Sequence, residues 1–169
     1  SKKKEFRSLS NFSEHEVEIL GKRFYLTGEL CFHGEKYIRL GECCSDEKRK
    51  KKLLDYGQHF LKGGKFKTSA EAKKAGGKRG LMLNDDEIEK WKMISVEVQY
   101  EICNWKLEHY EDVREDLKKS IGKILVHPAM RCNDEKIISR FWEGREIVKD
   151  GKSIIIGGNK LGEIWMNVR

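Results

Sequence analysis

The stretch NDDEIEKWKMISVEVQYEICNWK, from Asn84 to Lys106, contains the clearest helix signal in the chain. Asn84 and Glu87 have the spacing of a capping box, in which each side chain bonds the backbone of the other at a helix N-terminus. Apolar side chains then recur at intervals of three or four, the period of one helix face. They are Ile88, Trp91, Ile94, Val98, Ile102 and Trp105. We expect a long helix whose apolar face belongs to the core.

Shorter elements are expected before this helix. The segment VEILGKRFYLTG alternates apolar and polar residues around Gly21, which predicts a small hairpin. Its inward-facing candidates are Val17, Ile19, Phe24 and Leu26. A helix is expected to open with the Thr-Gly pair at 27–28. Two more helices are predicted over 48–62 and 68–76, the second with Ser69 as its cap and glycines as its stop.

After the long helix, the pattern is more mixed. EDVREDLKKS (111–120) predicts a further helix, and KILVHPAM (123–130) predicts a short buried strand that ends at the proline. The segment 135–150 is compatible with helix or strand. Alternation in KSIII and LGEIWMNVR, on either side of a GGN turn, predicts a closing strand pair over 152–169.

These elements predict an α+β fold, mainly helical with a small β-sheet, in one domain over 9–169 after a basic, loose lead-in over 1–8. With 38% apolar and 37% charged residues, the composition is that of a soluble globular domain. No apolar run approaches the ~20 residues of a membrane span, and the start lacks a signal-peptide apolar region. We therefore expect a cytoplasmic monomer without a membrane partner. The five cysteines lack zinc spacing, so reduced thiols are expected, with no metal and no cofactor.

The positive charge of the chain is concentrated in one segment. Between Lys48 and Arg79, twelve lysines and arginines stand against two acids, a net charge of +10, whereas the whole chain carries +7. Lysines near phosphates release condensed counterions, so this segment favours a polyanion partner. A solvated, lysine-rich helix face is the alternative. The candidate phosphate or DNA contacts are Lys50, Lys51, Lys78 and Arg79.

The segment TGELCFHGEKY (27–37) combines helix signals with residues of catalytic type. At 100° per residue, Glu29, His33 and Lys36 share one side of the helix, opposite an apolar side. The same side also holds Phe32 and Leu40. Glu29 and Lys36 lie about 10.5 Å apart along the axis, too far for the usual i,i+4 ion pair and better placed to hold something between them. Two interpretations stay open, a solvated helix face or a functional site.

Five motifs follow one another along the chain. They are LSNF (9–12), GKRFYLTGELCFHGEKY (21–37), WKMISVEVQYEICNWK (91–106), Trp142 with Gly144, and GGNKLGEIWMNVR (157–169). In type and order these motifs resemble the NADAR family, which includes the YbiA-like N-glycosidases. The resemblance covers residues 9–169, and its terminal motif is the most specific. It implies a NADAR-like fold and cleavage of an N-glycosidic bond at ribose C1.

The resemblance implies roles for individual residues. The ribosyl carbon becomes positive as the base leaves, so a carboxylate there stabilises charge or positions a water, and Glu29 is the candidate. Lys36 is the candidate for an amine nucleophile that forms a Schiff base with the ring-opened sugar, which requires a pKa well below ~10.4. The simpler role for Lys36 is a clamp on phosphate or ribose hydroxyls. Candidate substrate-binding residues are Asn11, Phe12, Phe32, His33, Trp91, Trp142 and Asn159, although Trp91 equally fits a core anchor.

From this resemblance we expect a hydrolase that removes ADP-ribose from modified DNA bases in single-stranded or otherwise accessible DNA. Guanine is the first candidate base. ADP-ribose would be the product, and the reaction would reverse the marking of DNA by a toxin or a defence system. The basic segment favours this branch, because hydrolysis of a small metabolite needs no such charge. Two alternatives stay open: an N-glycosidase of riboflavin-biosynthesis intermediates, and a non-catalytic module that binds ADP-ribose or nucleic acid.

Overall fold

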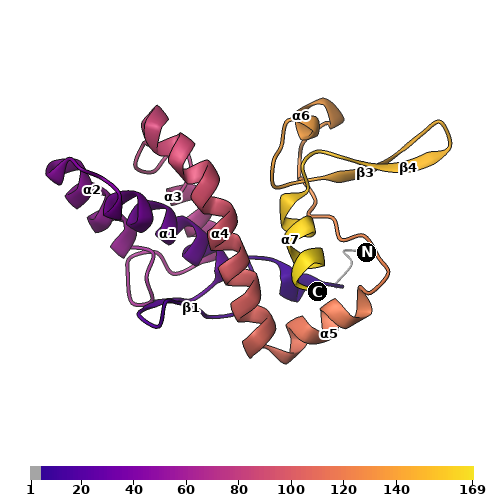
Figure 1. Ribbon diagram of the computed structural model, residues 1–169, viewed down its shortest axis with the longest axis horizontal. Coiled ribbons are helices and arrows are strands. Elements are labelled where there is room, and N and C mark those ends of the chain that lie inside the picture. Colours follow the sequence, from indigo (N-terminus) through magenta and orange to yellow (C-terminus); the bar gives the residue numbers. More distant parts are fainter. Residues whose placement is uncertain (1–4) are drawn as a thin grey trace. The chain divides into compact units, whose positions relative to one another are not determined.

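The computed structural model of the protein describes residues 5–169 (Figure 1). About 52% of the chain is helical and two small antiparallel sheets accompany the helices, so the predicted mixed α+β class is confirmed. The described residues form two compact units, an N-terminal unit that ends at Val113 and a C-terminal unit over Arg114–Arg169. A single domain over 9–169 stays a prediction. Among residues 5–169, no helix is both long enough and apolar enough to cross a bilayer.

The N-terminal unit holds the elements that precede α5 (Glu111–Lys119), which runs across the boundary between the units. In chain order they are the 3-10 turn η1 (Arg7–Leu9), β1 (Val17–Ile19), β2 (Arg23–Tyr25), α1 (Gly28–Glu42), α2 (Glu47–Gln58), α3 (Ser69–Ala75) and α4 (Asp85–His109). Of the expected loose lead-in, residues 1–4 lie outside the described residues. Ser8 is buried within η1 and is therefore not loose.

Helix α1 lies at the centre of this unit and contacts α2, α3, α4 and β2 (Figure 1). Thr27 caps it, since the Thr27 hydroxyl accepts from the Leu30 N–H at 3.2 Å. A Cβ at Gly57 would lie 2.7 Å from the side chain of Ile38, so glycine at this position lets α2 pack closely on α1. Because α1 is covered on several sides, Leu40 is buried, as is Lys36 on the same side of the helix.

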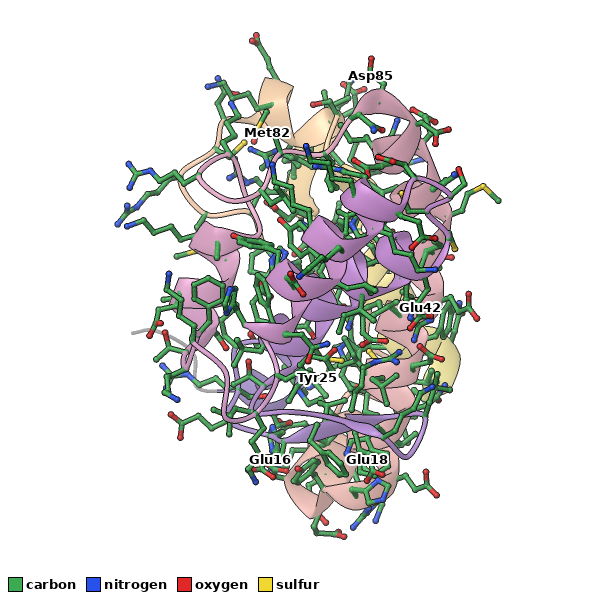
Figure 2. The ribbon with its side chains drawn as sticks, turned by 90° about the vertical axis from the view of Figure 1, so that its left-hand side faces the viewer. Glu16, Glu18, Tyr25, Glu42, Met82 and Asp85 are labelled. Atoms are coloured by element: carbon green, nitrogen blue, oxygen red, sulfur yellow. The ribbon has the colours of Figure 1, made fainter. Side chains whose placement is uncertain are left out.

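A buried carboxylate joins α1 to the hairpin of β1 and β2. Glu35 is fully buried and accepts hydrogen bonds from Arg23 at 2.7 Å, from Arg39 at 3.0 Å and from the Tyr25 hydroxyl. Burial acts to raise the pKa of Glu35, but the bonds from Arg23 and Tyr25 outweigh it and hold this pKa below its ordinary value. Figure 2 shows Tyr25 in the middle of this view of the unit.

The predicted hairpin is present, with a different inward face on its second strand. Val17 and Ile19 are buried as expected, and Leu26 is partly buried against the core. Phe24, however, is 50% exposed, and Tyr25, paired with Val17, is buried in its place. The turn places three residues between the strands and pairs Val17 with Tyr25, so the inward positions keep the alternation of Val17 and Ile19 and fall on Tyr25 rather than on Phe24.

Helix α4 extends along the N-terminal unit. Its capping box is formed, with the Glu87 N–H 2.8 Å from the Asn84 side chain and the Asn84 N–H 2.9 Å from the Glu87 side chain. In Figure 2 the helix starts near Asp85 at the upper end, and Glu16 lies at the lower end. There the indole of Trp105 donates to the Glu16 carbonyl at 3.2 Å.

The apolar stripe of α4 is only in part a core stripe. Val98 and Ile102 are buried, Trp91, Ile94 and Trp105 are partly buried against the core, and Ile88 is 40% exposed. Two helix boundaries also differ from expectation. Helix α2 ends at Gln58 rather than at residue 62, and the cap of α3 is Thr68, because the Thr68 hydroxyl accepts from the Glu71 N–H.

The C-terminal unit contains α6 (Asp134–Ile138), β3 (Arg145–Lys149), β4 (Lys152–Ile156) and α7 (Lys160–Val168). Strands β3 and β4 pair antiparallel around Asp150 and Gly151, which both have positive φ angles. An Asp-Gly pair is a favoured two-residue hairpin turn, so KSIII pairs backward with β3 rather than forward with the tail.

Two sequence predictions in this unit are wrong. Residues 123–130 are not a strand in the described chain, where Pro128 makes a single bridge to Gly144. The tail LGEIWMNVR is helix α7, not a strand. Leu161, Ile164 and Trp165 are buried at helical spacing, so burial of this face outweighs the short alternation read from the sequence.

Candidate functional site

Three polar side chains of α1 form a hydrogen-bonded row, which we call the Glu29 row. Glu29, His33 and Lys36 stand at positions i, i+4 and i+7, and therefore on one side of the helix. The Nε2 atom of His33 lies 3.0 Å from a carboxylate oxygen of Glu29, and its Nδ1 atom lies 3.3 Å from Nζ of Lys36. The gap expected between Glu29 and Lys36 is thus filled by the imidazole of His33.

The donors in this row determine where His33 carries its proton. An ammonium group only donates, so Nδ1 of His33 accepts from Lys36, and the ring proton lies on Nε2 and is donated to Glu29. Burial lowers the pKa of His33, while the bond to Glu29 acts in the opposite direction. The lowered pKa keeps the imidazole neutral at pH 7, as this bonding requires.

Lys36 is almost completely removed from water, with 6% of its surface exposed. Its Nζ donates to the carbonyl oxygen of Gly76 at 2.6 Å, at the C-terminal end of α3. Burial lowers the pKa of Lys36 to about 8, although the nearby Glu29 acts to raise it. At pH 7 about one Lys36 in ten is therefore a neutral amine. The same group suits a nucleophile and a clamp.

The contact with His33 requires glycine at position 76. A Cβ added to Gly76 would lie 2.1 Å from Nδ1 of His33, far inside any real contact distance. The Gly76 backbone therefore touches both His33 and Lys36. Glycine at position 76 therefore allows this close approach, in addition to ending α3 as predicted from the sequence.

Two aromatic side chains flank the Glu29 row. The rings of Phe32 and Trp91 meet edge to face with centroids 5.1 Å apart, and Phe32 lies 5.5 Å from the His33 ring. Phe32 and Trp91 are partly buried against the core. Trp91 thus lies near the row as well as on the core stripe, and its role in stacking on a base stays a prediction.

The loop that carries Asn11 and Phe12 lies against the N-terminus of α1. The Asn11 carbonyl accepts the Glu29 N–H at 2.8 Å, and the Asn11 side chain exchanges hydrogen bonds of 2.7 and 3.0 Å with Gln99. Phe12 is 44% exposed, and Nζ of Lys73 lies 5.8 Å from its ring centroid. The Asn11 backbone therefore lies next to Glu29, while both ends of the Asn11 side-chain amide are bonded to Gln99.

Most basic side chains of the segment 48–79 are at the surface. The exposed ones are Lys48, Lys51, Lys52, Lys62, Lys65, Lys67, Lys73, Lys74, Lys78 and Arg79, while Lys50 is half-buried. Arg49 has a structural role, because its guanidinium pairs with the Glu87 carboxylate at 2.7 Å. Lys51 pairs with Asp55 at 2.5 Å, which offsets part of its charge. Lys78 and Arg79 follow the Gly76–Gly77 pair and carry positive charge next to the end of α3.

The remaining candidates, Trp142 and Asn159, belong to the C-terminal unit. Trp142 is half-buried and meets the Phe141 ring at 5.1 Å. Asn159 is buried, with a positive φ angle of 46°. Its amide accepts from the His127 N–H and donates to the Leu125 carbonyl, each at 2.9 Å. These bonds hold the irregular segment over 125–127 and occupy both ends of the amide.

Three residues of the N-terminal unit support the candidate site and were not predicted from the sequence. Gly76 supplies the acceptor for Lys36, Gln99 holds Asn11, and Lys106 is buried beside the same loop. Gln99 and Lys106 are seven residues apart on α4 and therefore share a face, which was the available signal.

Among the described residues, no group of three or more histidines, cysteines, aspartates or glutamates is arranged to hold a metal ion. All five cysteines are free, with Cys31 and Cys103 buried. No protein-family model, no curated protein and no solved structure matches the chain.

Proposed function

We propose that the protein hydrolyses the N-glycosidic bond between ribose C1 and a base, and that its substrate is ADP-ribosylated DNA, with guanine as the first candidate base. The observation that carries this proposal is the Glu29 row, in which a carboxylate, a neutral imidazole and a buried amine are hydrogen-bonded in series. The motif resemblance to the NADAR family also supports the proposal, since it implies a carboxylate and an amine at these two positions.

Glu29 stands at the sugar in this proposal. When the bond from C1 to the base nitrogen breaks, its electrons leave with the base and C1 becomes positive. A carboxylate beside C1 stabilises this charge and accepts a proton from the attacking water. The Nε2–H of His33 donates to Glu29 and fixes the orientation of the carboxylate.

Lys36 is the amine of the reaction. In its neutral form, Nζ adds to C1 of the ring-opened sugar, which still carries the base, and the base then leaves with one proton, so that a protonated Schiff base forms between Nζ and C1. Addition of water to this imine then releases the free sugar and restores the amine. A pKa of about 8 supports this role, because a useful fraction of Lys36 is neutral near pH 7.

The surroundings of the row supply binding groups of the required kinds. Phe12 is an exposed ring that follows Asn11 in the chain, and Phe32 and Trp91 form an aromatic pair next to His33. Aromatic rings stack on bases in a sequence-tolerant way, which suits a modified base. The exposed lysines of the segment 48–79 favour a nucleic acid over a small metabolite.

The test is release of ADP-ribose from an oligonucleotide that carries ADP-ribosylated guanine, measured by chromatography. Glu29→Gln should lose roughly a hundredfold or more in rate, because an amide cannot accept the proton. Glu97→Gln, an exposed position on α4, should retain the wild-type rate. The proposal would be wrong if the wild-type protein released no ADP-ribose or if Glu29→Gln kept full activity.

Borohydride reduction tests the Schiff base separately. Reduction during turnover should fix a sugar adduct on Lys36, found by peptide mass spectrometry, and Lys36→Arg should show no adduct. Turnover without any adduct would leave Lys36 as a clamp. Two further substrates distinguish the alternatives: turnover of a ribosylaminopyrimidine phosphate alone would indicate the metabolite hydrolase, and calorimetric binding of ADP-ribose without any turnover would indicate a binding module.

A further inference from the structure

A second buried lysine lies on α4, outside the Glu29 row. Lys106 is 0% exposed, and its Nζ donates to the carbonyl oxygens of Ser8 at 2.6 Å and Ser10 at 3.0 Å and to the Ser13 hydroxyl at 2.9 Å. Three acceptors match the three N–H donors of an ammonium group. All three belong to residues 8–13, which we call the anchored loop.

A charge in this position requires compensation. Removing an ammonium group from water costs several kcal/mol, and a methionine of similar length would fill the space without that cost. The compensation for Lys106 comes from the backbone carbonyls and the hydroxyl of the anchored loop. The attraction between the ammonium charge and these oxygens therefore stabilises the observed conformation of the anchored loop.

The anchored loop is also bound at the residues between these acceptors. Gln99, on the same face of α4 as Lys106, holds the Asn11 side chain, and the Asn11 carbonyl accepts the Glu29 N–H. The Ser69 hydroxyl of α3 donates to the Phe12 carbonyl at 3.3 Å. Lys106 of α4 thus binds the oxygens of Ser8, Ser10 and Ser13. The residues between them contact α1 and α3, near Glu29.

The far end of the loop has a second support. The Ser13 hydroxyl lies 2.7 Å from Nδ1 of His15, and Nε2 of His15 lies 2.8 Å from the Asp112 carboxylate. Ser13 therefore joins the Lys106 ammonium to a His15–Asp112 pair. Removal of its hydroxyl would take one of the three acceptors from Lys106.

We propose that Lys106 is a positioning residue, which shapes the anchored loop so that Asn11 and Phe12 stand beside Glu29. For its effect on catalysis this inference rests on the proposed function. Its effect on the loop needs no substrate, so the two can fail separately.

The amide of Glu29 reports directly on the loop. It lies in the first turn of α1, where an N–H has no acceptor within the helix, and its partner is the Asn11 carbonyl. The next amide, that of Leu30, bonds to the Thr27 hydroxyl of the helix cap. Release of the loop should therefore speed exchange at the Glu29 amide alone, whereas fraying of the helix should speed exchange at both the Glu29 and the Leu30 amides.

The experiment is amide hydrogen exchange by NMR on the full chain, comparing Lys106→Met with Lys92→Met, an exposed lysine on the same helix. In Lys106→Met the amides of Glu29 and Ser13 should exchange roughly tenfold faster or more, while that of Leu30 changes little. If Lys106→Met does not fold, Ser13→Ala should show a smaller acceleration in the same direction. An unchanged Glu29 amide in the folded variants would overturn the inference.

Kinetics test the catalytic half. With the modified oligonucleotide, Lys106→Met should raise KM roughly tenfold with a smaller change in kcat, as expected when binding groups are misplaced, and Lys92→Met should match the wild type. An unchanged KM would overturn the positioning of substrate by Lys106. If the wild-type protein releases no ADP-ribose, the proposed function fails, while faster exchange at Glu29 still supports the anchoring of the loop.

Discussion

The carbonyl oxygen of Gly76 lies 2.6 Å from the ammonium group of Lys36, across 40 residues of sequence. The same glycine leaves room for the His33 ring, which a Cβ would meet at 2.1 Å. One residue at the end of α3 therefore determines the positions of two members of the Glu29 row.

Gly76→Ala should displace His33 and break the row. We expect loss of roughly tenfold or more in the rate of ADP-ribose release, with a stability loss of about 1–3 kcal/mol from overpacking, measured by urea unfolding. Gly77→Ala is the control, because a Cβ there comes no closer than 3.3 Å to the Lys73 carbonyl. Equal activity of the two variants would contradict this role of Gly76.

The activity should rise with pH as Lys36 loses its proton. Since burial lowers the pKa of Lys36 to about 8, the neutral fraction increases about fiftyfold between pH 6 and pH 8 and levels off above that. We expect the rate of ADP-ribose release to follow this curve at constant ionic strength. A flat profile from pH 6 to pH 9 would exclude Lys36 as the nucleophile.

Stability should depend on pH through Lys106. Burial lowers the pKa of Lys106 to about 8 in the folded chain, against opposing effects of Cys103 and Asp112, whereas an ordinary lysine has 10.5. Between these values the unfolded chain binds the proton more tightly, so the free energy of unfolding rises with pH. From pH 7 to pH 9 this amounts to about 1 kcal/mol. Urea unfolding of Lys106→Met should lack this rise relative to the wild type, and parallel curves for the two proteins would contradict it.

Loss of the buried carboxylate should weaken the N-terminal unit. Glu35→Ala leaves Arg23 and Arg39 without their buried partner, and we expect a loss of about 3–5 kcal/mol in the free energy of unfolding. Glu42 also reaches Arg23, at 3.5 Å, but its side chain is 53% exposed. Glu42→Ala should therefore cost less than about 1 kcal/mol. Similar losses in the two variants would show that burial of Glu35 contributes nothing.

The basic segment should set the salt dependence of DNA binding. Replacing Lys50, Lys51, Lys78 and Arg79 by Gln should make the slope of log affinity against log salt shallower by about 0.9 for every phosphate that the variant no longer neutralises. Lys51 should contribute least, since Asp55 already pairs with it.

The control for this experiment changes the same amount of charge elsewhere. Replacing the exposed Lys118, Lys119, Lys149 and Lys152 by Gln should leave the slope nearly unchanged. Equal changes in the two sets would assign the effect to net charge alone.

The sequence predicted the N-terminal half of the fold better than the C-terminal half. The capping box of Asn84 and Glu87 and the cap at Thr27 were found because each acts within one helical turn. The predicted strand in the tail is wrong because LGEIWMNVR fits both alternation and helical spacing over its short length. The Asp150–Gly151 turn is the local signal that pairs β4 with β3.

The sequence by itself determined the long helix α4 with its capping box, the opening of α1 at Thr27, and the presence of Glu29, His33 and Lys36 on one side of α1, because these follow from spacing along a single helix. Only the tertiary structure decided that His33 fills the gap between Glu29 and Lys36, that Gly76 accepts from Lys36, and that Lys106 closes a loop more than 90 residues away. The physical reason is burial. Packing removes these amines from water, and their partners are then whichever backbone oxygens the fold brings within reach.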